Sequence, residues 1–148
     1  MTSDVNQNLW RHVKELPSVS ADVAPFLDAI VEELERRSWD GGDVFAIRLA
    51  LDEAVANAIE HGNRRDPSKK IILTAEICGE RILVSIQDEG PGFHVDAVKD
   101  PTLAENLELP AGRGLFLIRN FMTRVWHNEK GNIIYMEKTP QANAEPEA

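Results

Sequence analysis

Three short segments combine residue types that could bind a nucleotide and act on its phosphates. The first places a carboxylate and an amide at helical spacing, the second an acid at the end of a strand, and the third glycines at the start of a helix. In chain order they are Glu53-x-x-x-Asn57-x-x-x-His61, Asp88-Glu89-Gly90-Pro91-Gly92 and Gly112-Arg113-Gly114-Leu115. Each alone is common, but together and in this order they predict ATP bound with a divalent metal.

The first segment forms a polar stripe on a predicted helix. At about 100° per residue, Glu53, Asn57 and His61 lie within about 80° of one another. Ala46 and Ala50 share the stripe, so its N-terminal half is expected to be nearly bare. The neutral oxygen of Asn57 suits a hard cation that keeps water and phosphate ligands, and Glu53 could orient or deprotonate a nucleophile. The alternative is a solvent-exposed polar stripe, in which His61 interacts with the last carbonyl groups of the helix.

The second segment ends a predicted strand with an acid. Strand alternation places Asp88 on the same, buried face as Ile82, Val84 and Ile86. A carboxylate there needs a partner, and because it only accepts hydrogen bonds it could select the exocyclic amine of adenine over guanine. The glycines of this segment, Gly90 and Gly92, would let the backbone approach a flat base. A plain turn after a strand is the alternative interpretation.

The third segment could bind an anion. Gly112 and Gly114 at a helix start expose backbone N–H groups toward a negative charge, and Arg113 adds a cationic fork suited to phosphate. The pattern is neither a Walker loop nor a Rossmann loop. The alternative is a flexible loop joined to a buried helix that begins at Leu115.

The elements around these segments predict an α+β two-layer sandwich. Ser20-Ala21-Asp22 offers an N-cap for a first helix, Asp43 begins a second, and Gly62 ends it. In residue numbers, we expect a strand or its lead-in over 9–16, helices over 20–37, 43–61 and 115–122, and strands over 71–77, 82–86, 125–127 and 133–137. Two-residue and three-residue turns at 79–80 and 130–132 would join strands.

Length and charge limit the possible functions. A chain of 148 residues is expected to form one domain, here 9–139, with a flexible N-terminus over 1–8 and a disordered tail over 140–148. The formal net charge of −9 argues against nucleic acid as a partner, because phosphate binding needs a basic footprint. The sequence has no apolar signal region and no run of membrane-spanning length, so we expect a cytoplasmic protein without membrane contact.

The three segments resemble the motifs of the GHKL (HATPase_c) superfamily. Residues 53–62 resemble its asparagine box, Asp88-x-Gly90-x-Gly92-Phe93 its first glycine box, and Gly112-Arg113-Gly114-Leu115 its second. The resemblance implies the Bergerat fold, a mixed and mostly antiparallel sheet covered on one face by helices, with ATP under a lid over 93–111. It also implies that Asn57 binds Mg²⁺, Glu53 is the catalytic base and Asp88 reads adenine. The remaining nucleotide-binding residues that it implies are Gly90, Gly92, Phe93, Gly112, Arg113, Gly114 and Leu115.

Among GHKL proteins, the compact chain is most similar to bacterial anti-sigma factor serine-protein kinases. This resemblance implies a partner-switching regulator that sequesters a sigma factor and phosphorylates a STAS-type antagonist, and it suggests a homodimer. From the residues themselves we predict that Arg113, at the C-terminal hinge of the lid, senses the γ-phosphate, because a guanidinium can donate two hydrogen bonds to its oxygens. A second interpretation is a binding module whose ATP site only controls which partner it holds. A histidine-kinase catalytic domain is less favoured, because no helix pair with a phosphoacceptor histidine precedes the ATP motifs.

Overall fold

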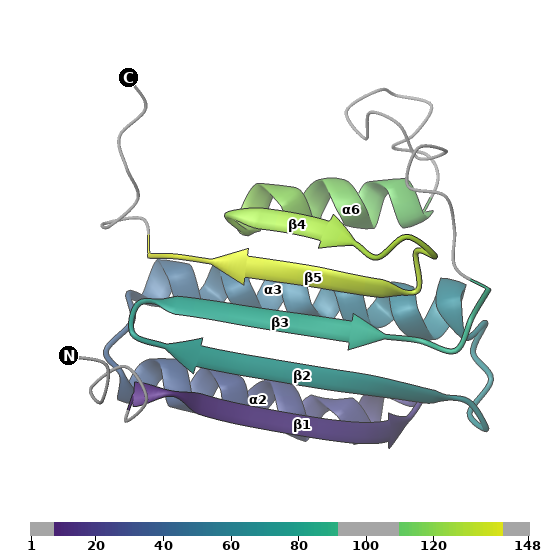
Figure 1. The fold of residues 1–148 in the computed structure, drawn as a ribbon, viewed down its shortest axis with the longest axis horizontal. Helices are drawn as coiled ribbons and strands as arrows, with labels where there is room; N and C mark the ends of the chain where they lie inside the picture. The colour runs from purple at the N-terminus through teal and green to yellow at the C-terminus, as the bar shows by residue number, and fades with distance from the viewer. Residues whose placement is uncertain (1–7, 92–109, 141–148) are drawn as a thin grey trace.

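The fold stacks a layer of helices on one face of a five-stranded sheet (Figure 1). The computed structural model describes residues 8–91 and 110–140, with side chains for all of these except 110–114. In chain order the elements are β1 (Trp10–Pro17), α2 (Ser20–Arg36), α3 (Gly41–Asn57), the π-helical turn η1 (Ala58–Gly62), β2 (Lys70–Cys78), β3 (Arg81–Gln87), α6 (Pro110–Phe121), β4 (Arg124–His127) and β5 (Ile133–Lys138).

The sheet has the strand order β1-β2-β3-β5-β4, and all four pairings between the described strands are antiparallel. The β2–β3 hairpin turns at Gly79, whose φ of 59° lies in the left-handed region that glycine adopts without strain. β5 returns between β3 and β4, so β4 forms one edge of the sheet and β1 the other. The predicted α+β two-layer sandwich is confirmed.

Alternate residues along β2 and β3 are apolar, and their side chains form the inner face of the sheet. In β2 the inward side chains Ile71, Leu73, Ala75 and Ile77 are fully buried, and in β3 those of Ile82, Val84 and Ile86 are buried beside them. Each fully buried aliphatic side chain of this size contributes about 1.5–3 kcal/mol relative to exposure. This apolar wall continues up to the strand end where Asp88 follows.

The helix α2 packs on this wall through a stripe of helical period that includes Val23, Leu27, Ile30 and Leu34. The predicted N-cap at Ser20-Ala21-Asp22 is wrong. The capping position is Val19, in an extended conformation and without a side-chain cap hydrogen bond. Its main-chain carbonyl accepts hydrogen bonds from Asp22 N–H and Val23 N–H instead.

The helix α3 differs from its prediction at both ends. It begins at Gly41 instead of Asp43, because the Asp40 carboxylate accepts a hydrogen bond from Gly42 N–H at 3.0 Å and caps the first turn. The regular helix then ends at Asn57, and η1 continues it as a wider turn in which Asn63 N–H donates to the Ala58 carbonyl at 2.8 Å. π-helical turns of this kind are often found at functional sites.

The helix α6 packs against α3 and β4 (Figure 1). It begins at Pro110 instead of Leu115, and proline is favoured at a first helical position because its missing N–H has no helical partner to lose. Ala50, expected on a bare stripe of α3, is fully buried. None of the described helices is long and apolar enough to cross a membrane.

Candidate functional site

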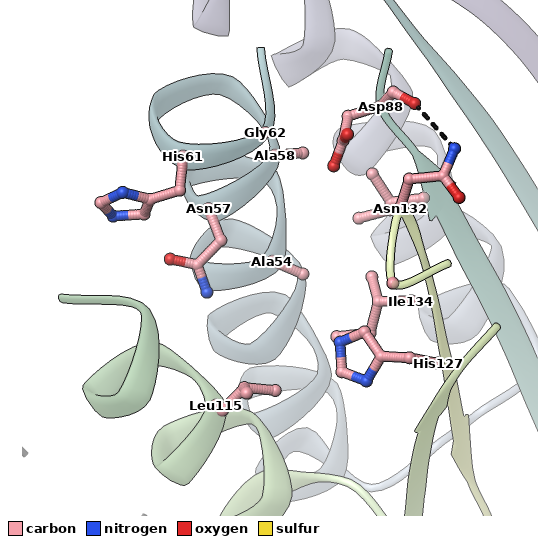
Figure 2. A pocket seen from close by; sticks show the side chains of 12 residues that line it. Ala54, Asn57, Ala58, His61, Gly62, Asp88, Leu115, His127, Asn132 and Ile134 are labelled. Carbon is pink, nitrogen blue, oxygen red and sulfur yellow. Dashed lines mark hydrogen bonds between the residues drawn. The ribbon is translucent and has the colours of Figure 1, made fainter. Parts of the chain in front are cut away.

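A cavity of about 160 Å³ opens between the C-terminal part of α3 and the ends of three strands (Figure 2). It is lined by Ala54, Asn57, Ala58, His61, Gly62, Ile86, Asp88, Leu115, His127, Gly131, Asn132 and Ile134. A buried apolar cavity of about 150 Å³ is large enough to admit benzene. The cavity therefore has room for a planar ring between apolar walls, with a small number of polar groups to orient it.

Asp88 is the acidic group of this cavity. It follows the last residue of β3, and its carboxylate Oδ1 accepts a hydrogen bond from Gly90 N–H at 2.8 Å. Its main chain is fixed by Asn132, whose carbonyl accepts from Asp88 N–H at 3.0 Å and whose Nδ2 donates to the Asp88 carbonyl at 3.3 Å (Figure 2). The placement predicted from strand alternation is therefore the one found: Asp88 lies in the cavity beside Ile86.

Burial raises the pKa of the Asp88 carboxyl group. The Gly90 N–H hydrogen bond and the positive charges of Lys130 and Lys69 act in the opposite direction and partly offset the desolvation. A carboxylate in this position gains from any ligand that offers it another hydrogen-bond donor. An exocyclic amine on a flat base would supply such a donor.

Two glycines make the close approach around Asp88 possible. A Cβ atom at Gly62 would collide with the Asp88 carboxylate, and a Cβ atom at Gly90 would collide with the main-chain carbonyl of Gly62. The turn after β3 therefore lies directly against the end of η1. At both positions only glycine fits without a shift of neighbouring backbone or of the carboxylate.

The polar stripe of α3 is only partly in the cavity. Asn57 lines it, on the wall across from Asp88 (Figure 2). His61 also contributes to the lining but is exposed at its edge. Glu53 is half-buried one helical turn before Asn57 and does not line the cavity, and within the described residues no hydrogen bond or ion pair involves it. The structure thus brings together Asn57 and Asp88 in one cavity and leaves Glu53 outside its lining.

The β4–β5 hairpin supplies residues that the sequence analysis did not identify. His127, Gly131 and Asn132 line the cavity, together with Ile134. Burial, followed by the charge of Arg119, lowers the pKa of His127 from 6.5 to about 4, so the imidazole is neutral near pH 7. Of these residues, the sequence pattern indicated only that 130–132 form a turn. Nothing in its spacing indicates that this turn reaches Asp88, about forty residues earlier.

The second glycine box is described in part. Leu115, one of the residues that the resemblance implies for nucleotide binding, lines the cavity. The backbone of Gly112, Arg113 and Gly114 lies inside the first turns of α6, after Pro110 and Ala111, which were expected at the end of the lid. The side chains of 110–114 fall outside the description, and so do Gly92, Phe93 and the predicted lid up to residue 109.

The oxygen atoms of Asn57 and Glu53 fit a metal ion that is bound together with a phosphate group. Within the described residues, no cluster of three or more histidine, cysteine, aspartate or glutamate side chains could hold a metal by itself. Asn57 and Glu53 nevertheless present one amide and one carboxylate a helical turn apart, and Mg²⁺ is commonly bound by one or two protein groups together with water and substrate phosphates. The apolar cavity, the half-buried carboxylate of Asp88 and the glycine contacts fit a purine base.

Comparisons with known proteins agree with this geometry. A family profile described as a histidine kinase-like ATPase domain matches residues 16–138. The anti-sigma F factor of Clostridium perfringens (strain 13 / Type A) is 34% identical over 126 residues, which cover 82% of this chain and 82% of the relative. The anti-sigma F factor of Geobacillus thermodenitrificans (strain NG80-2) is 30% identical over 126 residues, covering 82% of this chain and 79% of the relative. The chain therefore belongs to the histidine kinase-like ATPases of the GHKL superfamily, in the family of the anti-sigma factors.

Proposed function

We propose that the protein binds ATP with Mg²⁺ in this cavity, holds a sigma factor, and transfers the γ-phosphate to a serine or threonine of an antagonist protein. The observation that best supports the nucleotide part is Asp88, a half-buried carboxylate at the end of an apolar strand face, in a cavity closed by the Gly62 and Gly90 contacts. The partner part rests on the similarity to anti-sigma F factors.

The base is held by groups of the described chain. Asp88 accepts a hydrogen bond from the exocyclic amine of adenine, while Ile86, Ile134 and Leu115 pack against the ring. The hydrogen bonds from Asn132 to the Asp88 main chain keep the carboxylate at the cavity wall. Because guanine presents a carbonyl oxygen at the corresponding position, it would face the carboxylate with an acceptor and lose this contact.

The phosphates extend along α3 towards Asn57 and Glu53. Bound Mg²⁺ would neutralise phosphate charge, and Asn57 offers it one neutral oxygen ligand. In this proposal Glu53, one turn further towards the N-terminus of α3, accepts the proton of an incoming hydroxyl group. Transfer then breaks the bond between the β-γ bridging oxygen and the γ-phosphorus and forms one to the hydroxyl oxygen, leaving ADP and a phosphorylated serine or threonine.

A phosphotransfer assay tests the kinase part. The protein is incubated with γ-labelled ATP, Mg²⁺ and candidate antagonists from the same cell, and the modified residue is mapped by mass spectrometry. We expect label on one serine or threonine, a loss of transfer of about two decades or more in Glu53→Gln, and little change in Glu60→Gln. Glu60 is the matched control because it undergoes the same chemical change on η1, at an exposed position that pairs with Arg65.

A binding assay separates the two interpretations of the partner switch. The sigma factor is captured with wild type and with Glu53→Gln in the presence of ATP or ADP. Nucleotide-dependent capture together with phosphotransfer supports the proposed function. Nucleotide-dependent capture with no phosphotransfer to any candidate would leave the binding module as the function, acting in the cytoplasm on the same partners.

A further inference from the structure

Asn63 is a polar side chain that is completely buried beside the cavity without lining it. It is 0% exposed, although it follows η1 at the start of a polar loop. Its amide makes three hydrogen bonds to three separate segments of the chain. The partners are Glu89 N–H, the Lys70 carbonyl and the Ser18 hydroxyl, at 2.7, 3.0 and 3.2 Å.

The π-helical turn explains why Asn63 points inward. An additional residue in a helical turn shifts the direction of the following side chains by roughly 100° relative to an uninterrupted α-helix. Here Asn63 N–H reaches the Ala58 carbonyl, and Arg65 N–H reaches the Ile59 carbonyl at 2.7 Å. Arg64 and Arg65 then take positive φ values of 52° and 61°, which non-glycine residues rarely adopt. Backbone in this region persists where the surrounding structure fixes it.

Only an amide side chain satisfies all three partners. The oxygen Oδ1 accepts from Glu89 N–H, while Nδ2 donates to the Lys70 carbonyl and to Ser18 Oγ. The N–H on one side and the carbonyl on the other fix which end of the amide faces each partner. A carboxylate could keep the first contact but not donate to the carbonyl, and an aliphatic side chain would leave buried polar groups unpaired.

These bonds hold the turn that carries Asp88. Glu89 follows Asp88 directly, and its own carboxylate accepts from Lys70 N–H at 2.9 Å, so the turn is tied to the start of β2 twice. Asn132 holds the same turn from the β5 side. We propose that Asn63 is a positioning residue that fixes the Asp88 carboxylate for base recognition and so sets the selectivity for adenine over guanine. This inference rests on the proposed nucleotide site.

The first measurement needs no nucleotide. Hydrogen exchange of the Glu89 amide, followed by NMR, reports whether Asn63 Oδ1 holds it. We expect a slow Glu89 amide in wild type, a fast one in Asn63→Ala, and a slow one in Asn63→Asp, which keeps the acceptor. Ser18→Ala is the matched control, because it removes only the Ser18 contact and should leave Glu89 slow.

The second measurement is the ratio of dissociation constants for GTP and ATP in the same variants. We expect the ratio to fall by about one to two decades in Asn63→Ala, and to stay near wild type in Asn63→Asp and Ser18→Ala. Ile30→Val, a conservative change in the core of α2, lowers stability without touching the turn and should leave the ratio unchanged.

The two measurements together decide the inference. The role of Asn63 is overturned if a variant loses the slow exchange of the Glu89 amide but still prefers ATP over GTP. It is also overturned if a variant loses the preference for ATP while the Glu89 amide still exchanges slowly. If Asn63→Ala does not fold, Asn63→Ser, whose hydroxyl is too short to reach Glu89 N–H, takes its place in both measurements with the same expected results. Wild type that binds ATP and GTP equally would instead remove the proposed nucleotide site, whatever the variants do.

Discussion

Asp88 is placed where its charge is unfavourable in the protein without ligand. It lies at the end of an apolar strand face, and burial raises its pKa even though Gly90 N–H and two lysines stabilise the ionised form. A residue selected only for stability at this position would be neutral. The charge is therefore best explained by what the carboxylate can bind.

Asp88→Asn should lower the preference for ATP over GTP and raise the stability of the fold near pH 7. The amide keeps an acceptor for Gly90 N–H but presents an NH₂ group that can face the adenine amine, so the preference for ATP over GTP should fall by about one to two decades. Because the folded-state pKa is raised, the stability associated with protonation is present at low pH and lost as pH rises through that pKa. The variant should consequently unfold at higher temperature than wild type at pH 7, with a difference that shrinks towards pH 3. Calorimetric titration and thermal scans measure both effects, and equal ATP and GTP affinities in wild type would contradict the assignment of Asp88.

Asn57→Ala should abolish metal-dependent ATP binding and leave the fold intact. Asn57 lines the cavity and is only half-buried, and no hydrogen bond of the described residues depends on its side chain. Its removal therefore costs little stability but deletes an oxygen ligand for Mg²⁺. Titrations with ATP in Mg²⁺ and in EDTA are the measurement. Equal Mg²⁺-dependent affinities in wild type and variant would exclude Asn57 as a metal ligand.

His127 should make the fold sensitive to acid. Burial lowers its pKa from 6.5 to about 4, so the folded state favours the neutral ring. Stability is then fully present above the unfolded value and is lost as pH falls from about 6.5 to about 4, by on the order of 2 kcal/mol after allowance for solvent screening of a partly exposed ring. Denaturant unfolding of wild type and His127→Gln across this range should show the loss only in wild type. His61→Gln, at an exposed position, is the control and should follow wild type.

At the scale of elements, α6 is held to the sheet by a buried cation. Lys138, near the end of β5, donates from Nζ to the Phe121 carbonyl at 2.6 Å, the last residue of α6, and lies 3.9 Å from the Asp43 carboxylate near the start of α3. A positive charge at a helix C-terminus is favourable because the last carbonyl groups have no helical partners. This contact adds to the packing of α6 against α3 and β4 and links the C-terminal end of the helix to β5 and α3.

Lys138→Met should destabilise the fold by about 3 kcal/mol, because it removes a buried cation from the Phe121 carbonyl and from the neighbourhood of the Asp43 carboxylate. Denaturant titration gives the change in unfolding free energy. The double variant Asp43→Asn/Lys138→Met removes both charges and should recover part of the loss. A single variant as stable as wild type would show that α6 is held by apolar packing alone.

At the scale of the whole molecule, the cavity lies where α3, η1, β3, the β4–β5 hairpin and α6 meet, so a ligand there contacts both the helical layer and the sheet (Figures 1 and 2). A ligand that binds only the folded state stabilises it by about 2.7 kcal/mol at a hundredfold excess over its dissociation constant. We therefore expect ATP with Mg²⁺ to raise the midpoint of a single unfolding transition, and GTP at the same concentration to raise it much less. Asn57→Ala should lose the Mg²⁺-dependent part of the shift. An equal shift for both nucleotides would contradict base recognition by the cavity.

The sequence by itself determined which elements form, apart from their boundaries, and pointed to one residue of each of the three motifs that lines the cavity. Period-two apolar residues in β2 and β3 and helical stripes in α2 and α3 require one buried face each, so a two-layer α+β fold and the inward direction of Asp88 follow from local pattern. Asn57 and Leu115 were likewise found from the motifs. The binding and catalytic roles of all these residues stay predictions. In addition, Glu53 does not line the cavity and the side chain of Arg113 falls outside the described residues.

Only the tertiary structure decided the remainder, because it depends on contacts between residues far apart in the chain. The helix boundaries at Gly41 and Pro110 and the π-helical turn after Asn57 were missed, since caps and turn width depend on a few hydrogen bonds that helical periodicity does not encode. In the sequence, Asn63 looks like an ordinary polar loop residue. Only the structure shows that η1 directs its side chain towards Glu89, twenty-six positions later. Asn132 contacts Asp88, forty-four positions earlier in the chain, because β5 pairs with β3. This strand order depends on how the strands and helices pack together and not on any local sequence pattern.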